Sequence, residues 1–212
     1  MSLCQVIILL QRSLIRRGAE ADIFAVDWHG KKAVSKIRLP KQYRHPDLDL
    51  AVRRQRTVHE ASLMSAAKAA GVVTPFMYFV DPLNCEILME FVGGPNARDV
   101  LTAGLCKKMG SYSAMLHAKN IIHGDLTTSN FVVSNQLVLL DFGLSYYSQR
   151  IEDVAVDVRL IKEAFTSAHV SLKDSFESFL AGYLEVAGEK QTARVVEKVR
   201  EIEQRGRYAR VV

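Results

Sequence analysis

The sequence predicts an α+β fold in which a strand-rich first half precedes a helical second half. Short apolar or alternating runs gather in the first 91 residues. All five prolines lie at or before Pro95, so the rest of the chain lacks the residue that breaks helices and central strands. Its 212 residues suit one domain made of two lobes, expected at about 1–91 and 92–212.

The first lobe is expected to hold several strands and one helix. Runs of strand length occur at 6–10, 23–28, 32–37, 76–80 and 86–91, whereas 11–17 lacks a clean strand pattern. His29 and Gly30 mark a turn between the second and third runs. A helix is predicted at about 50–70, because Glu60, Met64 and Ala67 share one face and Gly71 would end it.

The second lobe is expected to begin after Gly93, Gly94 and Pro95, which punctuate the chain. A helix follows, because apolar residues recur with helical period between 105 and 116. Residues 131–133 and 137–140 read as two short strands around a polar turn, and the helical pattern returns from about Asp153.

Composition narrows the class of protein. Apolar residues make up 49% of the chain, which excludes disorder of the whole chain. The three cysteines, Cys4, Cys85 and Cys106, have neither disulfide-framework nor zinc spacing. The early apolar run at 6–10 is far shorter than the roughly 20 residues of a membrane span. We therefore expect a soluble intracellular protein, cytoplasmic or nuclear, with no membrane partner.

The strongest chemical signal is the segment 123–130, His-Gly-Asp-Leu-Thr-Thr-Ser-Asn, followed by Asp141-Phe-Gly. Phosphoryl transfer needs hard oxygen ligands for Mg²⁺ and a carboxylate that accepts or orients the proton of the attacking hydroxyl or water. The order and spacing of Asp125, Asn130 and Asp141 match the catalytic loop and metal-binding motif of protein kinases. The alternative is a loop with helix-capping side chains before an ordinary hairpin.

Lys36 has the sequence context of the strand lysine that holds nucleotide phosphates in kinases. Glu60 lies on the apolar face of its predicted helix, where a lone carboxylate would be costly. An ion pair between the two side chains would explain both positions. The alternative places Glu60 at the solvent edge beside Arg56.

The remaining nucleotide contacts are predicted from their positions around these residues. The loop at Gly18, Ala19 and Glu20 could lay backbone N–H groups over phosphates, although it has one glycine where kinases have three. Ile23 and Val34 would cover the base. The strand with Met89 and Glu90 would bring backbone groups to the edge of the adenine.

These segments resemble a known family. Residues 17–21, 43–46, 54–61, 123–130 and 141–145 are similar to the small atypical kinase/ATPase subunit of the KEOPS (EKC) complex, the p53-related protein kinase family. The resemblance extends from about residue 17 to 210. It implies a minimal two-lobed protein-kinase-like fold that binds ATP and Mg²⁺. By motif, Asp125 would be the catalytic base, Asn130 and Asp141 the Mg²⁺ ligands, and Lys36 the phosphate-holding lysine.

The resemblance also implies a function and partners. Members of this family act largely as ATPases beside a subunit that makes threonylcarbamoyl-adenosine in transfer RNA, and they phosphorylate proteins on Ser or Thr. We therefore expect an ATPase subunit of KEOPS, with the tRNA synthase subunit and small accessory subunits as partners. Two rival hypotheses remain: an independent Ser/Thr kinase of signalling substrates such as p53, and a pseudokinase-like binding module.

The chain lacks two features of ordinary protein kinases. No proline follows Asp141, so the Ala-Pro-Glu end of an activation segment is absent. Thr127 stands where typical Ser/Thr kinases place a lysine. Both differences favour slow transfer to water or to a bound partner over fast transfer to free peptides. Asp157 either braces the catalytic loop or is an acid on the surface of a helix.

Basic residues form two clusters within a net charge of +5. The first cluster comprises Arg38, Lys41, Arg44, Arg53, Arg54 and Arg56, and the second comprises Arg205, Arg207 and Arg210. Clustered positive charge favours nucleic-acid phosphates through counterion release, which would suit contact with transfer RNA. Solvated helix faces are the alternative interpretation.

Overall fold

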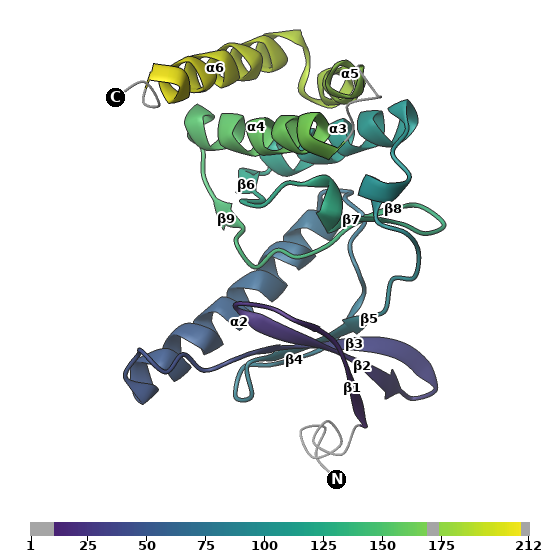
Figure 1. Cartoon of the computed structure of the whole chain (residues 1–212), viewed down its shortest axis with the longest axis vertical. Helices are drawn as coiled ribbons and strands as arrows, with labels where there is room; N and C mark the ends of the chain where they lie inside the picture. The colour runs from purple at the N-terminus through teal and green to yellow at the C-terminus, as the bar shows by residue number, and fades with distance from the viewer. Residues whose placement is uncertain (1–10, 169–173, 209–212) are drawn as a thin grey trace. The chain divides into compact units, whose positions relative to one another are not determined.

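The computed structural model describes residues 11–168 and 174–208 of the chain (Figure 1). The chain divides into two units. The first contains residues up to Ser62 together with Pro75–Val92, and the second contains Leu63–Thr74 and the chain from Gly93 onward. The division falls after Val92, next to the glycine pair that precedes Pro95, and it assigns residues 63–74 to the second unit.

A five-stranded antiparallel sheet forms most of the first unit. Its strands are β1 (Arg12–Arg17), β2 (Ala21–Trp28), β3 (Lys31–Arg38), β4 (Met77–Asp81) and β5 (Glu86–Glu90), in the spatial order β1-β2-β3-β5-β4. One face of the sheet buries Val26, Ala33 and Leu88.

The turn between β2 and β3 is confirmed. His29 and Gly30 have φ values of 51° and 76°, and the Gly30 N–H donates to Asp27 Oδ1 at 2.9 Å. Two successive residues with positive φ are typical of the two-residue hairpin turn whose twist matches that of the strands. The local sequence therefore fixes the β2–β3 register.

The position of the first described strand differs from the sequence prediction. β1 occupies Arg12–Arg17, a segment without a strand pattern, and all six of its residues are exposed. Among the described residues it pairs only with β2, as an edge strand, so no buried face imposes alternation on its side chains. The strand predicted at 6–10 lies outside the described residues.

Helix α2 (Pro46–Ala69) begins four residues earlier than predicted. Glu60, Met64 and Ala67 share its buried face. Gly71 ends the helix with φ 94° and donates its N–H to the Lys68 carbonyl, while Val72 N–H donates to the Ala67 carbonyl. A left-handed glycine at this position is a common helix terminator, because it lets the chain turn back on the last carbonyls.

The second unit is mainly helical. Its helices are α3 (Ala103–Ala118), α4 (Ile151–Ala168), α5 (Ser175–Ala187) and α6 (Glu189–Tyr208). Its strands are β6 (Ile121–Ile122), β7 (Phe131–Val133), β8 (Leu137–Leu139) and β9 (Tyr146–Tyr147), and two 3-10 turns span Ala97–Asp99 and Thr128–Asn130. β7 pairs with β8 as predicted, and β6 pairs with β9. No helix in the described ranges is long and apolar enough to cross a membrane.

Helices α3 and α5 pack against each other (Figure 1). They approach closely at two glycines. A Cβ at Gly110 would collide with the Phe179 carbonyl, and a Cβ at Gly182 would collide with the Lys107 carbonyl. Tyr112 and Tyr183 are buried in the same unit. The glycines therefore permit backbone contact between the helices, which side chains at these positions would prevent.

Replacing Gly110 with Ala tests this packing. We expect the Gly110→Ala chain to lose about 1–3 kcal/mol of unfolding free energy, the usual range for overpacking a rigid interior. Urea denaturation monitored by circular dichroism would measure it. The matched control is Gly104→Ala on the same helix, where the nearest atom is Thr102 Oγ1 at 3.9 Å. The control should be neutral or slightly stabilising; equal losses in both variants would contradict the close approach.

Candidate functional site

One face of the first unit's sheet carries four of the predicted nucleotide-binding residues. Ile23 pairs with Lys36 across β2 and β3, and Val34 pairs with Met89 across β3 and β5. Directly opposed residues project from the same face, as do residues two apart on one strand. The strand register thus brings Ile23, Val34, Lys36 and Met89 together as a contiguous apolar surface with one ammonium group.

A buried carboxylate on α2 bonds two cations from β3. Lys36 Nζ lies 2.6 Å from Glu60 Oε1, and Arg38 Nη2 lies 2.5 Å from Glu60 Oε2. The exposed fractions of Lys36, Arg38 and Glu60 are 8%, 4% and 1%. The Lys36–Glu60 ion pair is confirmed, and Glu60 is not at the solvent edge. The interpretation of Arg38 as part of a surface cluster is wrong, because its guanidinium is buried against Glu60.

The glycine loop is the tight connection between β1 and β2. A Cβ at Gly18 would lie 2.5 Å from the Ala21 carbonyl oxygen, so this turn requires glycine. The Ala19 carbonyl accepts a hydrogen bond from Lys41 Nζ. The Glu20 carboxylate lies 2.7 Å from Arg56 Nη1 on α2. The Glu20 side chain thus ties the loop to the helix.

The end of β5 uses its hydrogen-bonding groups within the sheet. Glu90 N–H donates to the Phe76 carbonyl at 2.7 Å, and the Glu90 side chain accepts from Phe76 N–H at 3.0 Å. Phe91 N–H donates to the Lys32 carbonyl at 3.4 Å. The backbone donor of Glu90 is therefore engaged, so an adenine edge at this strand would need donors beyond these residues.

In the second unit, the local fold gathers the three predicted oxygen-bearing side chains. Asn130 Nδ2 donates to Asp125 Oδ2 at 2.9 Å and to the Asp125 carbonyl at 2.7 Å. The β7–β8 hairpin extends to a bond from Leu140 N–H to the Asn130 carbonyl at 2.8 Å. Asp141 follows immediately and has φ 58°. The Asp125 and Asn130 side chains are thus bonded to each other, and Asp141 directly follows the residue whose backbone bonds Asn130.

Asp157 on α4 holds the catalytic loop through its backbone. Its two carboxylate oxygens accept the N–H groups of His123 at 2.6 Å and Gly124 at 2.8 Å. Asp157 is fully buried, so it is not a surface acid. Gly124 has φ 80°, and a Cβ there would collide with the Leu144 carbonyl. The prediction that Asp157 braces the loop is confirmed.

The His123 side chain joins the loop to the segment at Asp141. Nε2 lies 3.1 Å from the Leu140 carbonyl and donates to it, since a carbonyl can only accept. Nδ1 is buried without a hydrogen-bond partner among the described residues. The ring packs edge-on against Phe142, and Ser145 Oγ donates to the His123 carbonyl at 2.9 Å. These contacts join the segment at Asp141 to the loop at Asp125.

A second layer of side chains extends this support. The Tyr183 hydroxyl lies 2.9 Å from His117 Nδ1, and His117 Nε2 lies 3.4 Å from Asp157 Oδ2. Burial, and then the Asp157 charge, raise the pKa of the Tyr183 hydroxyl above its usual value. The hydroxyl therefore stays protonated beside His117. Sequence analysis missed both residues, because their link to Asp157 joins three separate helices.

The donor set fits Mg²⁺. Two carboxylates and an amide are hard oxygen ligands, and Mg²⁺ commonly takes one or two carboxylates while keeping several waters. Because Asn130 directs Nδ2 toward Asp125, its Oδ1 is the amide atom that could meet a cation. No group of three or more His, Cys, Asp or Glu side chains suited to a metal occurs within the described ranges. The residues thus suit a hydrated Mg²⁺ better than a closed protein cage.

Most of the first basic cluster is paired internally. Arg44 and Arg53 lie 3.6 and 2.6 Å from Asp49, and the hydrogen bond from Arg53, its largest cause, lowers the pKa of Asp49 below its usual value. Lys41 and Arg56 both face Glu20. Without Arg38, which is buried against Glu60, two carboxylates oppose the five remaining cations. The cluster retains an excess of three positive charges.

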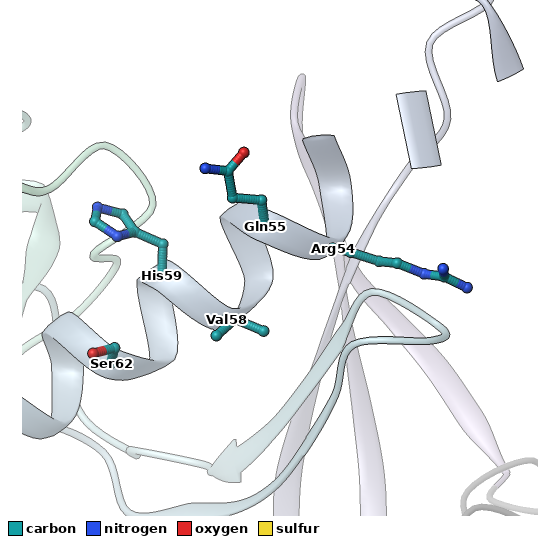
Figure 2. A pocket seen from close by; sticks show the side chains of 5 residues that line it. All are labelled: Arg54, Gln55, Val58, His59 and Ser62. Atoms are coloured by element: carbon teal, nitrogen blue, oxygen red, sulfur yellow. The ribbon is translucent and has the colours of Figure 1, made fainter. Parts of the chain in front are cut away.

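Arg54 of this cluster has no ion-pair partner among the described residues, and it lines an open groove along α2 (Figure 2). The groove has a volume of about 470 Å³ and is also lined by Gln55, Val58, His59 and Ser62. Glu60 is buried, whereas Val58 and His59 beside it are exposed. The groove is therefore distinct from the sheet face that carries Lys36.

The second basic cluster is only partly described. Arg205 lies 3.7 Å from Glu201 one helical turn earlier on α6 and is exposed. The Arg207 side chain and Arg210 lie outside the described part of the chain.

Comparison with known proteins identifies relatives over most of the chain. Residues 113–197 match the phosphotransferase enzyme family, APH. KEOPS complex subunit Bud32 of Pyrococcus abyssi is 37% identical over 92% of this chain and 96% of its own length. A probable bifunctional tRNA threonylcarbamoyladenosine biosynthesis protein of Methanobrevibacter smithii is 43% identical over 94% of this chain, which spans 37% of that longer relative.

Solved structures show the same fold. The Rio2 kinase of Chaetomium thermophilum, solved as an ADP/Mg²⁺-phosphoaspartate complex, matches with a TM-score of 0.63 at 20% identity. The match covers 92% of this chain and 71% of the Rio2 chain. The strand-rich unit with one helix and the helical unit therefore form a minimal protein-kinase-like fold. Because a relative of nearly equal length shares 37% of its aligned residues, the chain belongs to the family of KEOPS complex subunit Bud32.

Proposed function

We propose that this chain is the kinase-like ATPase subunit of a KEOPS complex and supports threonylcarbamoyl-adenosine formation in transfer RNA. The observation that carries the proposal is the bond between Asp125 and Asn130, together with the backbone bond that brings Leu140, the neighbour of Asp141, to Asn130. The names of the relatives give the biological setting, including the longer one that joins a similar chain to a threonylcarbamoyladenosine biosynthesis protein. The chain then acts on ATP with Mg²⁺ as cofactor.

Each group has a separate role in this proposal. Lys36 holds the phosphates of ATP, while Ile23, Val34 and Met89 cover the base. Asn130 and Asp141 would hold Mg²⁺, which supplies neutralisation of phosphate charge when bound. Asp125 accepts or orients the proton of the attacking water or hydroxyl. Its exposed carboxylate is steadied by Asn130 Nδ2, which supports this assignment.

The short segment after Asp141 favours ATP hydrolysis over fast phosphorylation of free peptides. Only residues 142–150 separate Asp141 from α4, and Tyr146 and Tyr147 in this segment pair with β6. Little chain is left to bind a peptide. Where the chain does phosphorylate protein, we propose Ser or Thr of itself or of a bound partner as the acceptor. An independent role toward signalling substrates has no specific support here.

The partners in this proposal are other KEOPS subunits, with the chain contacting transfer RNA through the first basic cluster. The charge excess of three and the unpaired Arg54 at the groove of Figure 2 support a weak phosphate contact. We also propose an intracellular location. The free thiols of Cys85 and Cys106, both buried, agree with a reducing compartment.

Substitutions at the oxygen cluster test the catalytic assignment. We expect Asp125→Ala and Asp141→Asn each to lower Mg²⁺-dependent ATP turnover by about 10²-fold or more, because each removes a charge that acts in the transition state. Turnover would be measured on the full chain alone and with companions captured from a native extract. The control is Asp99→Asn, an exposed acid in the same unit that pairs only with Arg98.

The two variants also separate an enzyme from a scaffold. Loss of both ATP turnover and tRNA modification by the complex would support the ATPase proposal. If tRNA modification survived in both variants while ATP turnover was lost, the chain would contribute its surface alone. Unchanged ATP turnover in both variants would remove the catalytic assignment.

The salt dependence of transfer-RNA binding tests the nucleic-acid contact. With an excess of three charges, we expect log K against log salt to fall with a slope of magnitude about 3 or less. Arg54→Ala should reduce that slope by about 1. Filter binding would measure both, with Arg159→Ala as control because Arg159 pairs with Glu163 on the surface of α4. A flat plot for the unsubstituted chain would exclude the contact.

A further inference from the structure

Glu60 has two cationic partners, whereas the proposed phosphate-binding role of Lys36 accounts for one of them. Lys36 bonds Oε1 and Arg38 bonds Oε2, at 2.6 and 2.5 Å. The two cations are two residues apart on β3, so both project from the same face of the sheet toward α2. The arrangement gives the buried carboxylate a separate partner for each oxygen.

The same arginine is tied to α2 through its backbone. Arg53 Nη1 on α2 donates to the Arg38 carbonyl at 3.4 Å, and Arg53 Nε is held by Asp49 at 2.6 Å. Arg38 N–H donates at 3.0 Å to the carbonyl of Cys85, the residue directly before β5. The end of β3 therefore receives a hydrogen bond from α2 and returns one through the Arg38 guanidinium. Both bonds lie within the first unit.

Electrostatics explains what the second cation does. When Lys36 turns toward a phosphate, a glutamate with no other partner would become a buried, uncompensated charge, and breaking a buried pair in this way costs about 3–5 kcal/mol. Arg38 keeps Glu60 paired in that state.

The short segment after Asp141 gives this pairing a purpose. In ordinary protein kinases, phosphorylation of the activation loop controls the position of the helix that carries the glutamate. Here residues 142–150 leave little chain for such a loop. A contact inside the first unit that holds α2 needs no activation segment.

We propose that Arg38 is a positioning residue that holds Glu60, and with it the part of α2 up to Ser62, against β3 independently of Lys36. The glutamate is thereby kept in place while Lys36 engages phosphate. The part of this inference that concerns ATP rests on the proposed function. The part that concerns the attachment of α2 rests on the first unit alone.

Amide hydrogen exchange of the full chain without nucleotide tests the attachment. In Arg38→Met, we expect exchange in α2 residues 50–62 to quicken by about tenfold or more relative to β5, the order expected for losing a buried charged hydrogen bond. In Lys36→Met, the same amides should stay within about threefold of the unsubstituted chain, because Arg38 still holds Glu60. Equal loss in both variants, or loss only in Lys36→Met, would overturn the proposal.

The chain offers a matched control and a rescue. Arg12 bonds the buried Glu86 carboxylate at 2.9 Å on the opposite face of the same sheet. Arg12→Met removes an arginine from a buried carboxylate without touching α2, so it should not quicken α2 exchange relative to β5. Arg38→Lys keeps a cation within reach of Glu60 and should restore most of the protection. If Arg12→Met also lowered the protection of α2 relative to β5, the effect would be general to the sheet, and the specific role of Arg38 would be overturned.

Steady-state ATP hydrolysis separates positioning from simple loss of folded protein. In Arg38→Met, we expect the KM for ATP to rise by about fivefold or more and Arg38→Lys to recover it, because Glu60 then competes with phosphate for Lys36. A smaller folded fraction would lower the apparent kcat and leave KM unchanged, which would contradict positioning. If the unsubstituted chain hydrolyses no ATP even with its companions, the proposed function fails, and the exchange result still decides the attachment.

Discussion

A carboxylate that is removed from water must have its oxygens satisfied, and this constraint organises the candidate residues within each unit. Glu60 is buried in the first unit and bonds Lys36 and Arg38. Asp157 is buried in the second unit and bonds the backbone of His123 and Gly124. Each carboxylate holds its neighbours in place, which are two cations on β3 in the first unit and two peptide groups of the loop in the second. The chemistry-bearing groups are then positioned by neighbours that do no chemistry themselves.

The two carboxylates act on different kinds of partner. Glu60 orients side chains, so its effect reaches only as far as the cations on β3. Asp157 orients peptide groups, and through them it sets the path of the loop that presents Asp125. Gly124 is needed there, because its φ of 80° turns the loop and a Cβ would strike the Leu144 carbonyl. The contacts of Glu60 therefore depend on the reach of two side chains, whereas those of Asp157 depend on the backbone conformation of the loop.

Sequence was sufficient where the relevant contacts are local or follow a known motif. The spacing of Asp125, Asn130 and Asp141 is set by a short loop and a hairpin, so reading the motif also gave the arrangement. Glu60 could be paired with Lys36 because a carboxylate on an apolar helix face demands a cation. The turn at His29 and Gly30 could likewise be predicted from two adjacent residues.

The rest depends on contacts that sequence spacing does not encode. Arg38 was grouped with surface arginines, since nothing in its neighbours distinguishes a buried guanidinium from a solvated one. β1 was missed because an edge strand with every residue exposed has no alternating pattern. His117 and Tyr183 are 66 residues apart on different helices, and only the packed fold brings them together beside Asp157.

The segment after Asp141 unites these observations. It returns at once to the catalytic loop, since Tyr147 pairs with Ile121 on β6 and Ser145 donates to the His123 carbonyl. A segment held this closely by backbone pairing cannot also be a long loop that phosphorylation orders. Control of the glutamate helix must then come from within the first unit or from a partner. Within the described part of that unit, Arg38 links the end of β3 to α2 through two bonds. One joins its guanidinium to Glu60, and the other joins its carbonyl to Arg53.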